Sequence, residues 1–252
     1  MNEQELINYY NKFNEDKRLN TKHAQVEFLT AMKYIKDYLK KGDKILDIGA
    51  GCGKYSITLS EMGYDVTAIE LVKHNLRVIQ KKSDKVKAFL GNALDLSRFD
   101  DDSFDVTLLF GPMYHLISKE DKVKALKEAL RVTRGVVLIS YCMNEYAIIT
   151  YGFIDNNIKN SKNNVDSNYH IISNEHDLYS YVRLEDINEI NDLASASRIK
   201  IISQDGPAEY LKKTINNMDD ETFHILLDYH FKNCERIELL GAGRHILDIV
   251  KK

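Results

Sequence analysis

The stretch "KILDIGAGCGKYS", residues 44–56, decides the fold. It is an apolar strand that runs into glycines at positions 49, 51 and 53 and then into residues that can begin a helix. Because glycine has no Cβ atom, such a turn bends tightly and lets a ligand touch the main chain. In an open parallel sheet, ligands bind beyond the carboxyl ends of the strands, beside the first turns of the following helices. The stretch therefore predicts a βα turn at a ligand-binding edge.

Strand-like and helix-like segments alternate on both sides of this turn. Residues 22–41 have the apolar spacing of a helix packed on one face, and Gly42 follows. Five strands separated by helix-length segments imply a parallel sheet with helices on both faces. Strands are expected at 44–49, 65–71, 86–94, 103–111 and 135–142, with helices at 54–63, 72–83 and 118–133. After an interruption, a helix (184–197), a strand (198–206), two helical segments (207–236) and a last strand (244–252) follow.

Composition restricts the class of protein. The chain has 252 residues and a net charge of −3, which suits one domain without a general attraction to nucleic acid or anionic membrane. Three separated cysteines, Cys52, Cys142 and Cys234, indicate reduced thiols rather than disulfides. The polar N-terminus is unlike a signal peptide, and no apolar run has the roughly 20 residues of a membrane span. We therefore expect a soluble, cytoplasmic protein with no membrane partner.

Phosphate-binding motifs fit the turn poorly. A P-loop needs Lys followed by Ser or Thr, whereas Lys54 is followed by Tyr55. A dinucleotide fingerprint begun at Gly49 would have its third glycine one place later than Gly53. The second strand ends in Glu70, where a carboxylate can accept hydrogen bonds from both hydroxyls of a ribose. The expected ligand is a nucleoside without a pyrophosphate.

These features resemble the class I S-adenosylmethionine-dependent methyltransferases. Their first motif, "hhDhGxGxG" with h apolar, is matched by "ILDIGAGCG" (45–53). The resemblance covers residues 20–142 closely and the two late strands more loosely. It implies a Rossmann-like, doubly wound, seven-stranded α/β sheet that is mostly parallel, with an antiparallel last strand.

The resemblance also implies a cofactor site. Asp47 would lie near the methionine amino group, Glu70 would bind the ribose, and Asn92 of "GNALDL" (91–96) would stand where the family has an acidic residue facing the adenine amine. Structural roles remain open: Asp47 as a capping residue, Glu70 as a solvated strand end, Asn92 as a turn residue. The full expected set is Asp47, Gly49, Ala50, Gly51, Gly53, Glu70, Leu71, Asn92, Ala93 and Phe110.

The loop after the fourth strand, within "DVTLLFGPMYHL" (105–116), is expected to border the methyl group. His115 is the candidate general base, although it could equally fix the loop or cover the cofactor. Tyr114 is a candidate wall of the acceptor pocket or a core aromatic. Methyltransferases of exocyclic base amines carry Asn/Asp-Pro-Pro-aromatic here, and this chain has "FGPM" (110–113), which disfavours nucleobase methylation. His170 and His176 lack ligand companions, so no metal is assigned.

Two further segments are expected to enclose the site. Residues 1–41 form a helical cover in which Tyr9 or Tyr10 folds over the cofactor, unless this helix only packs on the sheet edge. Residues 143–183 interrupt the alternation and form a lid over the acceptor pocket. Its aromatic residues are Tyr146, Tyr151, Phe153, Tyr169, Tyr179 and Tyr181.

The expected function is methyl transfer from S-adenosylmethionine to a small molecule, leaving S-adenosylhomocysteine. An RNA or protein acceptor is one alternative, and a protein that binds the cofactor without transferring methyl is another. The glycines at 241 and 243 precede a strand and are read as a turn, and His245 within that strand as structural.

Overall fold

The computed structural model describes residues 3–13, 15–241 and 243–252. It contains a seven-stranded sheet in the order β3-β2-β1-β4-β5-β7-β6. Strands β1 to β5 run parallel, and β7 pairs antiparallel with both β5 and β6. The sheet predicted from the sequence, including its antiparallel last strand, is confirmed. The strands are β1 (Lys44–Ile48), β2 (Asp65–Glu70), β3 (Lys87–Leu90), β4 (Phe104–Leu109), β5 (Thr133–Cys142), β6 (Ser197–Ser203) and β7 (His245–Lys251).

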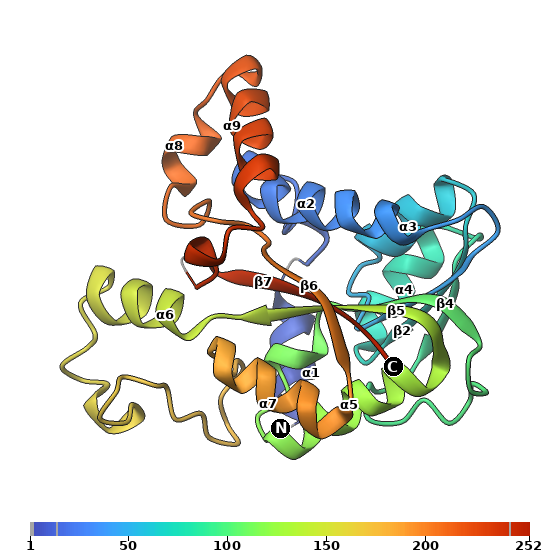
Figure 1. Ribbon diagram of the computed structural model, residues 1–252, viewed down its shortest axis with the longest axis horizontal. Coiled ribbons are helices and arrows are strands. Elements are labelled where there is room, and N and C mark those ends of the chain that lie inside the picture. The colour runs from blue at the N-terminus through green and yellow to red at the C-terminus, as the bar shows by residue number, and fades with distance from the viewer. Residues whose placement is uncertain (1–2, 14, 242) are drawn as a thin grey trace.

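Helices cover both faces of the sheet, as Figure 1 shows, and each face has its own apolar core. One core packs α2 and α3 against Ile45, Val66 and Leu108. The other packs α5 and α7 against Leu46 and Val137. The helices are α1 (Glu3–Lys12), α2 (Lys22–Tyr38), α3 (Lys54–Glu61), α4 (Lys73–Lys82), α5 (Lys119–Val132), α6 (Asn144–Ala147), α7 (Leu184–Ala194), α8 (Lys212–Asn216) and α9 (Asp220–Asn233).

Two helices end earlier than the apolar pattern indicates. The helix expected at 22–41 ends at Tyr38, because Leu39 has extended backbone angles. The helix expected at 184–197 ends at Ala194, because Ser195 adopts a left-handed conformation with φ of 57°. Ser118 caps α5 as expected, its hydroxyl accepting a hydrogen bond from the Asp121 N–H.

The 143–183 insertion is more regular than its composition suggests. It leaves the carboxyl end of β5 through α6, continues as a π-helix (Ile148–Ile154), and returns through irregular chain and a short 3₁₀ turn (Lys162–Asn164) (Figure 1). Asn144 fixes the return: its Nδ2 donates to the carbonyl of Tyr169, and its Oδ1 accepts from the Ile171 N–H. The Asn-rich part therefore folds back onto the start of the insertion.

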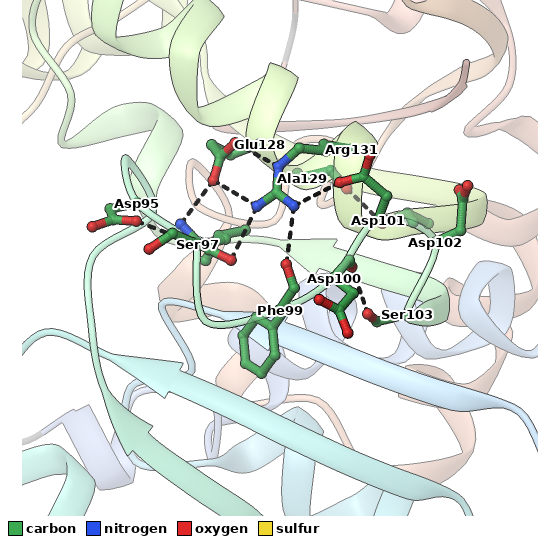
Figure 2. Close-up of polar contacts among 12 residues, drawn as sticks. Asp95, Ser97, Phe99, Asp100, Asp101, Asp102, Ser103, Glu128, Ala129 and Arg131 are labelled. Carbon is green, nitrogen blue, oxygen red and sulfur yellow. Dashed lines mark hydrogen bonds and ion pairs between the residues drawn. The ribbon is translucent and has the colours of Figure 1, made fainter.

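A half-buried arginine on α5 fixes the loop that joins β3 to β4. Figure 2 shows Arg131 donating to the carbonyl of Phe99 and to the carboxylates of Asp101 and Glu128. Its Nη2 also reaches the carbonyl of Leu96, and Glu128 accepts from the Leu96 N–H. Charge-assisted contacts of this kind are strong and directional. They hold the loop that begins at Asn92, next to the predicted ligand edge.

The described cysteines, Cys52, Cys142 and Cys234, are free and buried. No helix of the part of the chain that the structure describes is long and apolar enough to cross a membrane.

Candidate functional site

The glycine turn between β1 and α3 is held in conformations that favour glycine. Gly49, Gly51 and Gly53 have φ of 74°, 55° and 83°. The N–H groups of Gly49 and Ala50 both donate to the carbonyl of Ile69. A Cβ on Gly49 would lie 2.7 Å from Cδ of Pro112. The turn is therefore packed against the loop that follows β4, and a side chain at position 49 would push the two apart.

A cavity of about 320 Å³ opens over this turn, beyond the carboxyl ends of β1, β2 and β4. Every predicted cofactor-binding residue lines it except Gly53, whose place at the N-cap of α3 leaves it behind the wall against Ile79. Tyr114 and His115 line it as well. The predicted residues that line the cavity are Asp47, Gly49, Ala50, Gly51, Glu70, Leu71, Asn92, Ala93, Phe110, Tyr114 and His115.

Glu70 is buried at the end of β2 with its carboxylate turned to the glycine loop. Its two oxygens accept hydrogen bonds from the Gly51 N–H (2.7 Å) and the Val72 N–H (2.8 Å). Burial is the dominant influence and raises the pKa of Glu70 to about 7. It is thus not a solvated strand end. The Asn75 side chain is a third hydrogen-bond partner, so about one of the four lone-pair positions of the carboxylate is left for a further donor.

Asp47 lies in β1, 2% exposed, where its carboxylate accepts a hydrogen bond from the Ser56 hydroxyl at 2.5 Å. Burial raises the pKa of Asp47 to about 6, against the lowering effect of Ser56. No cation of the described residues pairs with it in an ion pair. A buried carboxylate with one hydroxyl partner is well placed to receive a cationic ligand group.

Asn92 lines the cavity, but its side chain also serves the local turn. The Oδ1 atom accepts a hydrogen bond from the Leu94 N–H at 3.0 Å. The geometry is therefore compatible with both expected roles of Asn92, as a turn residue and as an acceptor for the adenine amine, since an amide oxygen has a second lone pair.

Tyr55 is a cavity residue that the sequence analysis missed. It lies in the first turn of α3, and its ring packs between Phe28 and Phe110. Its hydroxyl is buried and has no hydrogen-bond partner among the described residues. A buried hydroxyl is normally paired, so this atom indicates room for a polar ligand. The signal in the sequence is its position: the second residue of a helix that begins at a ligand edge.

The N-terminal segment closes one side of the cavity through Leu6, Tyr10, Glu15 and Arg18. Arg18 donates from Nε to Glu15 and from Nη1 to both oxygens of Glu27. The positive charge of Arg18, opposed by burial, brings the pKa of Glu27 to about 2. The segment therefore does more than pack on the sheet edge.

His115 links this N-terminal helix to the insertion. Its Nδ1 lies 2.7 Å from the carbonyl of Leu178, so Nδ1 carries the proton and donates. Nε2 must then accept, and it lies 2.8 Å from the Tyr10 hydroxyl. Burial lowers the pKa of His115 to about 4. With both nitrogens engaged, the expected general-base role fits the geometry less well than the alternative of fixing the loop.

Tyr114 is half-buried at the same place and is tied to the insertion through the main chain. Its carbonyl accepts from the Ser180 N–H at 2.8 Å, and its ring lies 6.0 Å from that of Tyr179. The buried Lys122 donates to the Ser180 hydroxyl at 2.9 Å. Residues 178–180 are therefore anchored beside the loop after β4.

The charges that line the cavity are mixed. Among the described residues, three basic and five acidic side chains line it: Arg18, Lys54, Lys82, Glu15, Asp16, Asp47, Glu61 and Glu70. Within the described ranges, no group of three His, Cys, Asp or Glu side chains is placed to hold a metal ion. His170 pairs with Asp186 at 3.2 Å, and His176 is exposed. His245 is buried and faces Asp205 at 2.8 Å and Glu27 at 3.6 Å.

Comparison with known proteins bears on this arrangement. Residues 45–135 match a family described as a methyltransferase domain. The demethylmenaquinone methyltransferase of Paenarthrobacter aurescens is 36% identical over 97 residues, covering 38% of this chain and 36% of that protein. An uncharacterized methyltransferase of Mycobacterium tuberculosis is 34% identical over 91 residues, covering 36% of this chain. The chain spans 35% to 45% of the length of the first curated relatives it matches.

Solved structures extend the likeness over nearly the whole chain. A Thermotoga maritima protein described as a possible histamine N-methyltransferase has a TM-score of 0.59 at 17% identity, covering 97% of both chains. The geranyl diphosphate C-methyltransferase of Streptomyces coelicolor, solved with S-adenosylhomocysteine, has a TM-score of 0.57 at 12% identity, covering 89% of this chain and 79% of that one. At these low sequence identities, the comparison supports a shared fold and nothing further.

Proposed function

The chain belongs to the class I S-adenosylmethionine-dependent methyltransferases, and from this premise we propose that it transfers a methyl group from S-adenosylmethionine to a small-molecule acceptor. One observation carries the proposal. The glycine turn, Asp47, Glu70 and Asn92, which come from three different strand ends, line a single cavity.

The residues of the cavity fit the cofactor. The remaining acceptor position on Glu70 suits a ribose hydroxyl, and the buried carboxylate of Asp47 suits the methionine amino group. The unpartnered hydroxyl of Tyr55 and the guanidinium of Arg18 suit the methionine carboxylate. Asn92 would face the adenine amine. The glycine turn lets the main chain approach the ligand without Cβ atoms in the way.

When bound, S-adenosylmethionine supplies an activated methyl group, so the protein's task is mainly alignment. Holding two reacting groups in contact geometry contributes roughly 7 to 11 kcal/mol to lowering a barrier. Tyr114 provides a wall at the methyl end of the cavity, and His115 fixes that wall through Tyr10 and Leu178. We assign His115 a positioning role on this ground.

A small molecule is the proposed acceptor for two reasons. The insertion is anchored beside Tyr114 through the Ser180 N–H, which places it next to the expected methyl end of the cavity. The mixed charges of the cavity give no basic surface for a nucleic acid. RNA or protein methylation and cofactor binding without turnover remain the alternatives.

Calorimetry with S-adenosylmethionine and S-adenosylhomocysteine, against NAD and ATP, tests the cofactor. Binding of only the first pair is expected. Glu70→Ala should weaken that binding by about 1.5 to 3 kcal/mol, because hydrogen bonds to a charged acceptor are lost. Glu221→Ala, an exposed residue of α9, is the matched control. Equal affinity in the Glu70 variant and this control would remove Glu70 from the site.

Turnover separates the acceptor classes. S-adenosylhomocysteine formation is measured with a low-molecular-mass cell fraction, with total RNA and with total protein as acceptor pools. The proposal requires activity with the first pool. Activity confined to RNA or protein would identify the first alternative, and tight binding without turnover in any pool would identify the second.

A further inference from the structure

An arginine outside the cofactor cavity has no hydrogen-bond partner for its side chain in the part of the chain that the structure describes. Arg244 immediately precedes β7, and its carbonyl accepts from the Met143 N–H at the carboxyl end of β5. Its side chain is 24% exposed, and the guanidinium lies over the ring of Tyr146, 5.8 Å from the centroid. The nearest carboxylate oxygen, on Glu209, is 3.7 Å away, too far for a hydrogen bond, and it also faces His23 at 3.6 Å. Among the described residues, the guanidinium donates no hydrogen bond.

A second unpaired donor lies against the same tyrosine. The ring of Tyr210 is 5.4 Å from that of Tyr146, and its hydroxyl is buried without a hydrogen-bond partner among the described residues. Buried polar groups are nearly always paired, by protein, water or ligand. An arginine and a hydroxyl that belong to residues beside the same ring, both without a hydrogen-bond acceptor among the described residues, indicate a place for an acceptor-rich group.

Aromatic rings connect this place to the methyl end of the cavity. Consecutive ring centroids are 6.0 Å apart for Tyr114 and Tyr179, 6.3 Å for Tyr179 and Tyr181, 6.4 Å for Tyr181 and Tyr151, and 6.2 Å for Tyr151 and Tyr146. The Tyr114 ring also lies 6.1 Å from that of His245, the residue after Arg244. The rings thus form a continuous row from Tyr114, at the cavity, to Tyr146, which the Arg244 guanidinium contacts.

We propose that the acceptor is an organic acid and that Arg244 binds its carboxylate, with the Tyr210 hydroxyl as a second donor. A guanidinium presents a planar fork of donors that matches a carboxylate, and it stays charged at any working pH. The tyrosine rings would pack against the apolar body of the acid. Glu209 balances part of the arginine charge while no acid is bound. This inference rests on the proposed function, because it concerns the far end of the acceptor, and Arg244 is a specificity-determining residue rather than a catalytic one.

Ligand-observed NMR with matched acid and amide pairs tests the inference. The probes are benzoate, phenylacetate and 3-phenylpropionate, each against its primary amide, at millimolar concentration with S-adenosylhomocysteine saturating. The acids should bind and the amides should not. Arg244→Gln should weaken acid binding about 10-fold to 100-fold, as expected for lost charged hydrogen bonds. Arg236→Gln, an exposed arginine of the same terminal segment, is the matched control.

Two further variants distinguish a specific effect on acid binding from a loss of folding. Arg244→Lys keeps the charge but not the fork and should bind the acids with intermediate affinity. Tyr210→Phe removes only the unpartnered hydroxyl and should weaken the acids about 2-fold to 10-fold. Amides that bind as well as acids, acids that bind Arg244→Gln as well as the unmodified protein, or no acid binding at all would each overturn the inference.

The cofactor is measured separately, so the two proposals fail in different ways. The variants at positions 244 and 210 should bind S-adenosylhomocysteine with unchanged affinity, because neither residue lines the cofactor cavity. If the unmodified protein does not bind S-adenosylhomocysteine, the proposed function fails. The acid and amide comparison, repeated without the cofactor product, then still decides whether Arg244 binds carboxylates.

Discussion

Asp47→Asn should make the ligand-free protein more stable while weakening cofactor binding. Asp47 is 2% exposed, and burial raises its pKa to about 6 from an ordinary value of 3.8. At 1.36 kcal/mol for each pKa unit, keeping this carboxylate ionised costs the folded state about 3 kcal/mol above pH 6. Asparagine has the same shape, carries no charge and can still accept the Ser56 hydroxyl. Its gain should therefore approach that value at pH 8.

The stability change caused by Asp47→Asn should depend on pH in a definite direction. Because the folded pKa is raised, the cost is fully present above pH 6, falls as the folded protein takes up a proton below pH 6, and is absent below pH 3.8. The stabilisation by Asp47→Asn should shrink accordingly between pH 8 and pH 4.5. The free energy of unfolding is measured in urea by circular dichroism, since the chain has no tryptophan.

Asp105→Asn is a control of opposite sign. Its carboxylate, in β4, accepts from Arg134 and from the Lys44 N–H at the far end of the sheet, and the Arg134 hydrogen bond lowers its pKa. That variant should lose stability at pH 8. A pH-independent effect of Asp47→Asn, or a destabilisation at pH 8, would refute the reasoning. Unchanged affinity for S-adenosylhomocysteine would show that Asp47 does not contact the cofactor.

Three further outcomes are expected. Affinity for S-adenosylhomocysteine should fall by about tenfold per pH unit as the pH drops through 7, because the pKa of Glu70 is about 7 and its protonated form loses an acceptor. Calorimetry from pH 8.5 to 5.5 measures this affinity, and a flat profile would contradict the prediction. Tyr10→Phe should cost about 0.5 to 1.5 kcal/mol of local stability, because it removes the hydrogen bond to His115, and amide hydrogen exchange in residues 3–12 should become faster. Unchanged exchange would mean that this hydrogen bond does not hold the helix in place. Gly49→Ala should destabilise the protein by more than Gly42→Ala, because both glycines have a positive φ but only a Cβ at position 49 meets a neighbouring ring, that of Pro112. The urea midpoints of the two variants measure the difference, and equal losses would mean that backbone strain alone matters.

Local pattern was sufficient for most of the helices and strands and for the expected ligand edge of the sheet. Apolar spacing placed the strands, and the glycines at 49, 51 and 53 together with Glu70 identified where they end. These signals depend on near neighbours in the chain and on the rule that parallel strands end at one edge. The π-helix after Asn144 was not anticipated, because a stretch dominated by Asn, Ser and Tyr gives no clear period.

The sequence by itself indicated the alternation of strands and helices, the glycine turn and the acidic residues beside it, because each follows from residue type at a fixed spacing. The antiparallel last strand was expected from the family resemblance, and the burial of the acidic residues came from the structure. Only the tertiary structure decided what His115 does, since its partners Tyr10 and Leu178 are 105 and 63 positions away in the chain. It alone also showed that the side-chain donors of Tyr55 and Arg244 lack hydrogen-bond partners within the described ranges. Whether a polar group is satisfied depends on packing between distant segments, and no local pattern records that.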